Sequence, residues 1–226
     1  MMTFKEWFDK KYNGIDPCTI TTLDAFYENI TSLSGIEHLV NLETLYIPNN
    51  NISSLSGIEH LKSLQTLLIS YNKLSSLSEI LHLKNLKRLN ISHNKFSSLA
   101  GIEYLTELEY LFISNNKLSS LAGIEHLTSL KTLYIPGNKI SSLVGIEYLK
   151  NLQYLDISNN IIPSLAGIEH LVNLKHLCIL DNKLSSVSEI LYLKNLKRFN
   201  ITTDIPSLKR TIKYSSNVNL FTSSKK

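Results

Sequence analysis

A fixed internal period of 22 residues constrains this chain more than any other feature of its sequence. The phrase LEYLFISNNK at residues 108–117 returns at that interval along most of the chain. One column of the repeat is always isoleucine, and a second is asparagine until a closing aspartate. These columns are Ile47, Ile69, Ile91, Ile113, Ile135, Ile157, Ile179 and Ile201, and Asn50, Asn72, Asn94, Asn116, Asn138, Asn160, Asn182 and Asp204. Such a period predicts a solenoid, in which each repeat packs on its neighbours.

The spacing of apolar residues within one copy predicts its local structure. Apolar residues recur at steps of three from Phe96 to Leu111, and Ile113 follows after a step of two. The step of two is typical of a β-strand, so Leu111 and Ile113 should face the core. Tyr110 and Phe112 should then face outward. Steps of three suit tight 3₁₀ turns, and the asparagine column should be buried, where its amides satisfy backbone groups.

Departures from the period divide the chain into three parts. Residues 1–29 form an N-terminal cap, an amphipathic helix followed by a degenerate first strand. Residues 30–205 hold eight 22-residue repeats, and residues 206–226 form a C-terminal cap and tail. Thr3 and Glu6 have the spacing of a capping box at the start of the helix. A docking helix for a partner is the alternative interpretation of this segment.

Composition narrows the setting in which the chain works. The balance of 23 basic and 19 acidic residues gives a net charge of +4, too small to imply nucleic acid without a localised patch. The start has no apolar signal region, and no run approaches the roughly 20 apolar residues that span a bilayer. Cys18 and Cys178 lie seven repeats apart, too far for a disulfide. We therefore expect a cytoplasmic monomer.

Repeats such as LKSLQTLLISYNKLSSLSEI at residues 61–80 resemble the 22-residue class of leucine-rich repeats. That class is typified by the regulatory subunit of type-1 protein phosphatase, and bacterial internalins share the period. The resemblance implies an α/β leucine-rich-repeat solenoid with a curved parallel β-sheet on the concave face and short 3₁₀ turns on the convex face. It also implies that a protein partner binds on the concave face, and it leaves a regulatory subunit of a protein phosphatase as an alternative.

The outward strand positions bring large rings together in adjacent copies. Exposed aromatic side chains offer a large contact area with few rotamers to freeze, so they are typical anchors of protein interfaces. The competing explanation is that β propensity alone favours tyrosine and phenylalanine on strands. The residues that we predict to bind a protein are Tyr46, Leu68, Tyr71, His93, Tyr110, Phe112, Tyr134, Tyr154, Asp156 and His176.

Two further columns of the repeat, one of lysines and one of histidines, raise the question of other binding functions. A lysine ridge beside the concave face could bind a polyanion or nucleic acid, which is the alternative function. A histidine column lacks cysteine or carboxylate at the usual metal-ligand spacing, so we expect no metal. No phosphate-binding loop or nucleophile elbow is present, and we expect neither enzymatic activity nor a cofactor. The ridge is Lys73, Lys95, Lys117, Lys139 and Lys183, and the column holds His38, His60, His82, His126 and His170.

Overall fold

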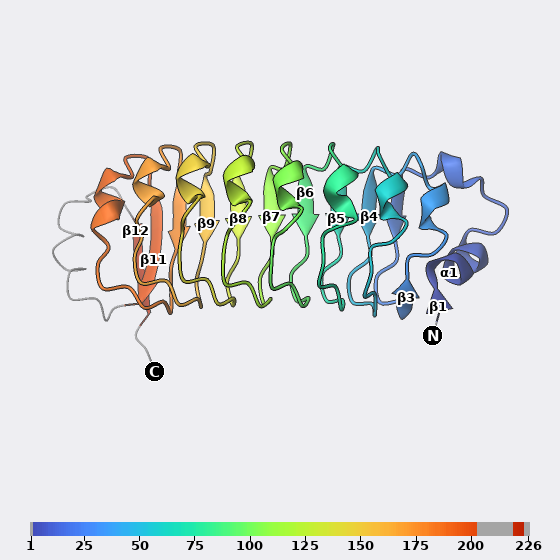
Figure 1. The fold of residues 1–226 in the computed structure, drawn as a ribbon, viewed down its shortest axis with the longest axis horizontal. Coiled ribbons are helices and arrows are strands. Elements are labelled where there is room, and N and C mark those ends of the chain that lie inside the picture. Colours follow the sequence, from blue (N-terminus) through green and yellow to red (C-terminus); the bar gives the residue numbers. More distant parts are fainter. Residues whose placement is uncertain (1, 203–218, 224–226) are drawn as a thin grey trace.

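The computed structural model describes residues 2–202 and 219–223, and it shows one elongated body (Figure 1). Each repeat contributes one short strand to a ten-stranded parallel sheet whose order is β12-β11-β10-β9-β8-β7-β6-β5-β4-β2. The strands are β2 (Thr22–Asp24), β4 (Thr44–Tyr46), β5 (Thr66–Leu68), β6 (Arg88–Asn90), β7 (Tyr110–Phe112), β8 (Thr132–Tyr134), β9 (Tyr154–Asp156), β10 (His176–Cys178), β11 (Arg198–Thr202) and β12 (Asn219–Ser223).

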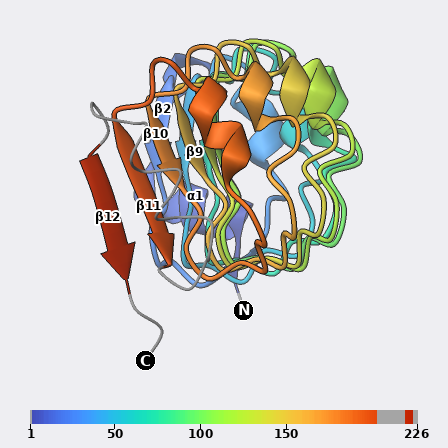
Figure 2. The same ribbon diagram turned by 90° about the vertical axis from the view of Figure 1, so that its left-hand side faces the viewer.

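Short 3₁₀ turns lie on the side of the solenoid opposite the sheet, as Figure 2 shows along the long axis. They are η2 (Ile36–His38), η3 (Ile58–His60), η4 (Ile80–His82), η5 (Ile102–Tyr104), η6 (Ile124–His126), η7 (Ile146–Tyr148), η8 (Ile168–His170) and η9 (Ser188–Tyr192), and η1 (Pro17–Thr19) precedes the first strand. The predicted solenoid architecture is confirmed. We call the outer side of the sheet, where the concave face was predicted, the sheet face, and we call the opposite side the turn face.

The core lies between the two faces and is built from the inward leucine and isoleucine columns. Leu111 and Ile113 are fully buried, and so is Phe96 at the start of the same copy. Because the strands pair in register, each inward residue lies beside its counterpart one repeat away, as Leu111 does beside Leu133. The hydrophobic stabilisation therefore grows with every added repeat.

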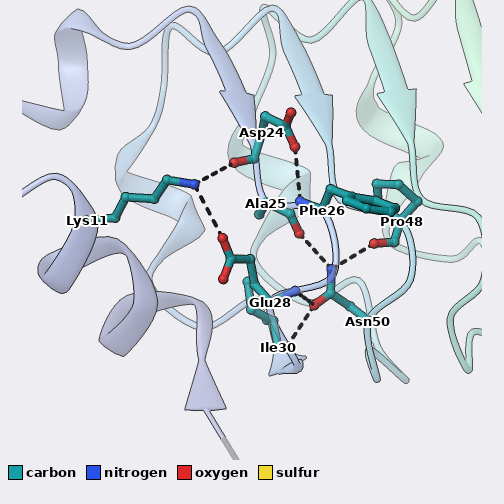
Figure 3. A network of polar contacts seen from close by, with 8 residues as sticks. All are labelled: Lys11, Asp24, Ala25, Phe26, Glu28, Ile30, Pro48 and Asn50. Atoms are coloured by element: carbon teal, nitrogen blue, oxygen red, sulfur yellow. Dashed lines mark hydrogen bonds and ion pairs between the residues drawn. The ribbon is translucent and has the colours of Figure 1, made fainter.

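The asparagine column forms a buried ladder that binds the turn after each strand. Asn50 begins it, and its Nδ2 donates to the carbonyl oxygens of Ala25 at 2.8 Å and Pro48 at 3.1 Å (Figure 3). Its Oδ1 accepts from the backbone N–H of Ile30 at 2.8 Å. The same pattern recurs at Asn72, Asn94, Asn116, Asn138, Asn160 and Asn182. The predicted role of the column is confirmed for these seven asparagines, and the closing Asp204 lies outside the described residues.

A glutamate column stabilises the start of the 3₁₀ turns on the turn face. The backbone N–H of Gly57 donates to Glu59 Oε2 at 2.7 Å, and Gly57 has a φ of +99°, a conformation that glycine adopts without strain. The same contact is made by Glu37, Glu103, Glu125, Glu147 and Glu169. These side chains therefore contribute to the fold and not to surface charge alone.

Helix α1 (Phe4–Lys11) covers the N-terminal end of the core. Its capping box is present, since the Glu6 N–H donates to Thr3 Oγ1 at 3.2 Å and the Thr3 N–H donates to Glu6 Oε2 at 2.7 Å. Strand β1 (Met2–Thr3), which the sequence did not predict, pairs in parallel with β3 (Ile30–Ser32). Trp7 lies in the core with an exposed fraction of 4%. The aromatic face of the helix is thus occupied by the protein itself, which argues against the docking-helix alternative.

The C-terminal end adds one more strand to the sheet, because β12 pairs in register with β11. Phe221 of this strand is 56% exposed. The remainder of the predicted C-terminal cap at residues 206–226 lies outside the described residues. Within the described part of the chain, no helix is both long and apolar enough to span a membrane.

Candidate protein-binding face

The sheet face carries eight of the ten predicted binding residues on strands β4, β5, β7, β8, β9 and β10. The other two, Tyr71 and His93, lie in the turns that follow β5 and β6. The rings of Tyr110, Phe112 and Tyr134 are half-buried, because neighbouring side chains in the same columns cover one side of each. The predicted residues therefore lie along one surface that crosses several repeats.

Phe112, Tyr134, Tyr154 and Asp156 form the centre of this surface, and we call them the central cluster. The rings of Phe112 and Tyr134 lie on adjacent strands, with centroids 6.1 Å apart and planes inclined by 48°. Tyr134 pairs with Asp156 in the register of β8 and β9. Tyr154 precedes Asp156 by two residues on the same strand, so its side chain points to the same side of the sheet.

Asp156 lies deeper in the surface than its position in the sequence suggested. It was predicted to face outward, and it does lie on the sheet face, but only 7% of it is exposed. The backbone N–H of Ser158 donates to its Oδ1 at 2.9 Å. The central cluster therefore combines three aromatic side chains with one nearly buried carboxylate.

The tyrosines of the central cluster hold their protons tightly. Burial raises the pKa of Tyr154 to about 12, and the nearby carboxylate of Asp156 adds to the effect. The pKa of Tyr134 is raised by the same two causes, of which burial is the larger. Both hydroxyls are therefore neutral hydrogen-bonding groups at physiological pH.

Tyr71 and His93 stack in neighbouring turns, with ring centroids 3.9 Å apart and planes inclined by 10°. Both have a φ of +54°, a left-handed conformation that is uncommon for large side chains. His93 Nε2 also lies 3.1 Å from Asn115 Nδ2 in the next turn, and burial lowers the pKa of His93. The stacked pair extends the surface of predicted binding residues beyond the ends of the strands.

The remaining predicted residues continue the surface toward both ends. Tyr46 stacks on Phe26 at 6.2 Å between centroids, and the guanidinium carbon of Arg88 lies 4.7 Å from the centre of the Tyr110 ring. Phe26 was not among the predicted binding residues. It occupies the same position of the repeat as Pro48, 22 residues later. His176 lies 6.0 Å from the ring of Tyr154, and its pKa is lowered by burial and by nearby basic residues.

Cys178 lies beside the central cluster on β10, but its surroundings do not favour nucleophilic chemistry. Burial raises the pKa of the Cys178 thiol, and the Ser158 hydroxyl donates to its Sγ at 3.1 Å. A nucleophilic cysteine requires a lowered pKa that gives the thiolate at neutral pH. The pair His176 and Cys178 therefore has the wrong electrostatics for catalysis.

Other columns lie away from this surface. The five lysines of the predicted ridge are exposed, and the predicted histidine column lies on the turn face. Each of four histidines there has its Nε2 3.7–4.0 Å from the glutamate that precedes it. Among the residues that the structure describes, no group of three or more histidine, cysteine or acidic side chains is placed to hold a metal ion.

Comparisons with known proteins agree with this architecture. The family model of leucine-rich repeats matches residues 62–104, 106–143 and 128–170. Internalin C2 of Listeria monocytogenes has a TM-score of 0.80 and 28% identity, over 82% of each chain. A leucine-rich-repeat protein of Leptospira interrogans has a TM-score of 0.72 and 31% identity, over 88% of this chain and 59% of that one. A search of curated protein sequences finds no match.

A more distant structure shares the fold alone. The leucine-rich-repeat ectodomain of the Arabidopsis thaliana receptor kinase GASSHO1/SCHENGEN3 has a TM-score of 0.65 and 22% identity, over 87% of this chain and 29% of that one. Together with the asparagine ladder and the parallel sheet, these matches define the class of protein. The chain carries leucine-rich repeats, folds as a leucine-rich-repeat solenoid and has internalins among its structural neighbours. Proteins of this fold are generally interaction scaffolds and not enzymes.

Proposed function

We propose that this chain is a non-enzymatic interaction module that binds a protein partner on its sheet face. The fold supports the general function, because leucine-rich repeats present a broad surface built from many short strands. The Arabidopsis receptor ectodomain is described in complex with CASPARIAN STRIP INTEGRITY FACTOR 2. That likeness concerns the fold, so it supports the class of function and does not identify the partner.

The observation that carries the proposal is the row of aromatic side chains on adjacent strands of the sheet face. Phe112 and Tyr134 contact each other and are only half-buried, so a partner could complete their burial. Aromatic residues in such a setting are frequent hot spots, because they desolvate a large area at a small entropic cost. Neutral hydroxyls on Tyr134 and Tyr154 add hydrogen-bonding capacity at the rim of that area.

Site-specific photo-crosslinking tests the proposal. A photoreactive phenylalanine analogue at Phe112 samples the sheet face, and the same analogue at Tyr104, an exposed residue of η5, samples the turn face. We expect a specific protein adduct from the first position and none from the second. Adducts from Tyr104 alone would contradict the proposal.

Ionic strength separates this function from polyanion binding. An interface anchored by aromatic side chains should keep its adduct yield when the salt concentration is raised, whereas binding through the exposed lysines should lose affinity steeply. Loss of the Phe112 adduct at moderate salt, together with recovery of nucleic acid, would favour the lysine ridge instead.

A further inference from the structure

We propose that Asp156 is the anionic centre of a subsite that receives a cationic side chain of the partner, with arginine as the favoured residue. This proposal rests on the proposed function, since it specifies the chemistry of one contact on the same face. The observation behind it is that the Asp156 carboxylate has no counterion among the described residues. Only 7% of Asp156 is exposed, and within residues 2–202 and 219–223 no lysine, arginine or histidine forms an ion pair with it.

A buried carboxylate without a counterion is costly. Removing a charge from water carries a large desolvation penalty, which an opposite charge or several hydrogen bonds normally offset. The Ser158 N–H is the one hydrogen-bond donor that reaches the Asp156 carboxylate among the described residues. Among the described residues, Asn200 Oδ1 is the one buried side-chain N or O atom without a hydrogen-bond partner, so Asp156 Oδ2 reaches the surface, where it can accept from a group outside the protein.

The local turn does not require this charge, as two other residues in the same column show. Asn90 accepts from the Ser92 N–H at 3.1 Å, and its side chain is a neutral amide. Asp24 accepts from the Phe26 N–H at 3.0 Å, but Asp24 is exposed, so water solvates its charge (Figure 3). Asp156 alone among the three combines burial with a charge.

The groups around Asp156 favour a planar, weakly hydrated cation. Tyr134 lies beside it on β8 and Tyr154 lies on its own strand, and both rings present electron-rich faces. A guanidinium group stacks on such faces and donates to a carboxylate at the same time, and it is desolvated more easily than an ammonium group.

Neighbouring basic groups do not already provide the counterion. Arg88 lies over the Tyr110 ring, and its strand is three steps from β9 in the sheet. His176 lies on the adjacent strand β10, but burial and the charges of Arg198, Lys197 and Lys175 lower its pKa. His176 is therefore neutral at physiological pH and leaves the charge of Asp156 uncompensated.

The test is a titration of the full chain with three short peptides, followed by amide chemical shifts. The peptides are acetyl-Gly-Ser-Arg-Ser-Gly-amide, its lysine counterpart and its citrulline counterpart, which keeps the shape of arginine without the charge. We expect saturable shifts centred on Tyr134, Tyr154 and Ser158 with the arginine peptide and none with citrulline. Binding of the lysine peptide as tightly as the arginine peptide, or more tightly, would overturn the assignment of arginine.

Two variants make the test specific. Asp156→Asn should weaken arginine-peptide binding by about tenfold or more, which is the loss of about 1.4 kcal/mol. Asp24→Asn, which removes a charge with the same local hydrogen bond, should leave binding unchanged. Equal binding by wild type and Asp156→Asn, equal binding of citrulline, or the absence of saturable shifts would overturn the subsite. Asp156→Asn should melt no lower than wild type, because Asn90 shows that an amide supports this turn.

The same variant distinguishes failure of the subsite from failure of the proposed function. Suppose that a partner crosslinked through Phe112 binds Asp156→Asn with full affinity but loses affinity for Phe112→Ser/Tyr134→Ser. The subsite is then wrong, and the sheet face remains the binding surface. If neither variant changes affinity for the partner, both proposals fail.

Discussion

Asn116 binds the turn of its own repeat to the preceding one, because its Nδ2 donates to the Ile91 carbonyl oxygen at 3.1 Å. The same side chain accepts from the Phe96 N–H at 3.0 Å and donates to the Ser114 carbonyl oxygen at 3.1 Å. Each ladder asparagine thus satisfies backbone groups of its own turn and of the preceding repeat. This arrangement explains why one amide is repeated at an interval of 22 residues.

Replacing Asn116 with alanine should destabilise the protein by about 1–3 kcal/mol, since buried backbone groups lose their partners. Chemical denaturation followed by circular dichroism measures the effect. Lys117→Ala is the control, because the neighbouring lysine is exposed and should change stability by less than about 0.5 kcal/mol. Unchanged stability of Asn116→Ala would show that the ladder is not needed.

Gly35 allows helix α1 to pack against the first repeat. A Cβ at this position would lie 2.7 Å from the Cβ of Lys5, and the φ of Gly35 is +98°. Gly35→Ala should therefore destabilise the cap by about 1–3 kcal/mol from overpacking, in addition to the backbone strain. Trp7 is the only tryptophan and lies in this cap, so its fluorescence reports the local unfolding.

Gly14→Ala is the matched control for the packing effect. Gly14 also has a positive φ of +78°, but a Cβ there would meet nothing within 4 Å. This variant should show the backbone strain alone, about 1–2 kcal/mol. Equal losses in the two variants would mean that contact with the helix does not constrain Gly35.

Because the pKa of Tyr154 is raised, the folded protein should lose stability as the pH becomes alkaline. The folded protein holds this proton up to a pKa of about 12, whereas an unfolded tyrosine titrates near pH 10. The contribution is complete below about pH 10 and is lost as the pH rises through about 12. The melting temperature of wild type should fall over this window more steeply than that of Tyr154→Phe. Equal slopes would contradict the assignment.

The two cysteines should react with thiol reagents at different rates. Cys18 is exposed, whereas burial raises the pKa of Cys178 and leaves it protonated at neutral pH. In the native protein we expect fast modification of Cys18 and slow modification of Cys178, which peptide mapping distinguishes. The Cys18→Ser variant isolates the slow site, and both sites should react rapidly in denaturant. Fast native labelling of Cys178 would be inconsistent with its surroundings.

The sequence predicted the repeating parts of the fold because each repeat satisfies the same physical requirements. The step of two between Leu111 and Ile113 predicted which side chains of the strand face the core. The asparagine column indicated the ladder. By contrast, β1 and β3 pair through only a few residues, and their pairing depends on how the N-terminal cap docks. The glutamate column had a signal, the recurrent Gly-Ile-Glu, whose meaning depends on backbone geometry at positive φ.

The sequence predicted which side of the sheet the candidate site residues face, but not how deeply each side chain is buried. Alternation along β9 places Tyr154 and Asp156 on the sheet face, yet it does not reveal how far neighbouring rings cover each side chain. Asp156 is buried because bulky residues occupy its own strand and the adjacent one. The stacking of Tyr71 on His93 was also hidden, since it requires a left-handed backbone at both residues, which is uncommon for tyrosine.

The most direct measurement of the central claim is the affinity of a crosslinked partner for a double variant of the sheet face. Phe112→Ser/Tyr134→Ser removes two anchors worth about 2 kcal/mol or more each, so binding should fall by roughly several hundredfold or more. The matched control, Tyr104→Ser/Tyr148→Ser, removes two exposed rings of the turn face and should bind as wild type does. Calorimetric titration of the purified partner, with melting temperatures unchanged, is expected to give this contrast. Full affinity in the sheet-face variant and lost affinity in the turn-face variant would contradict the account.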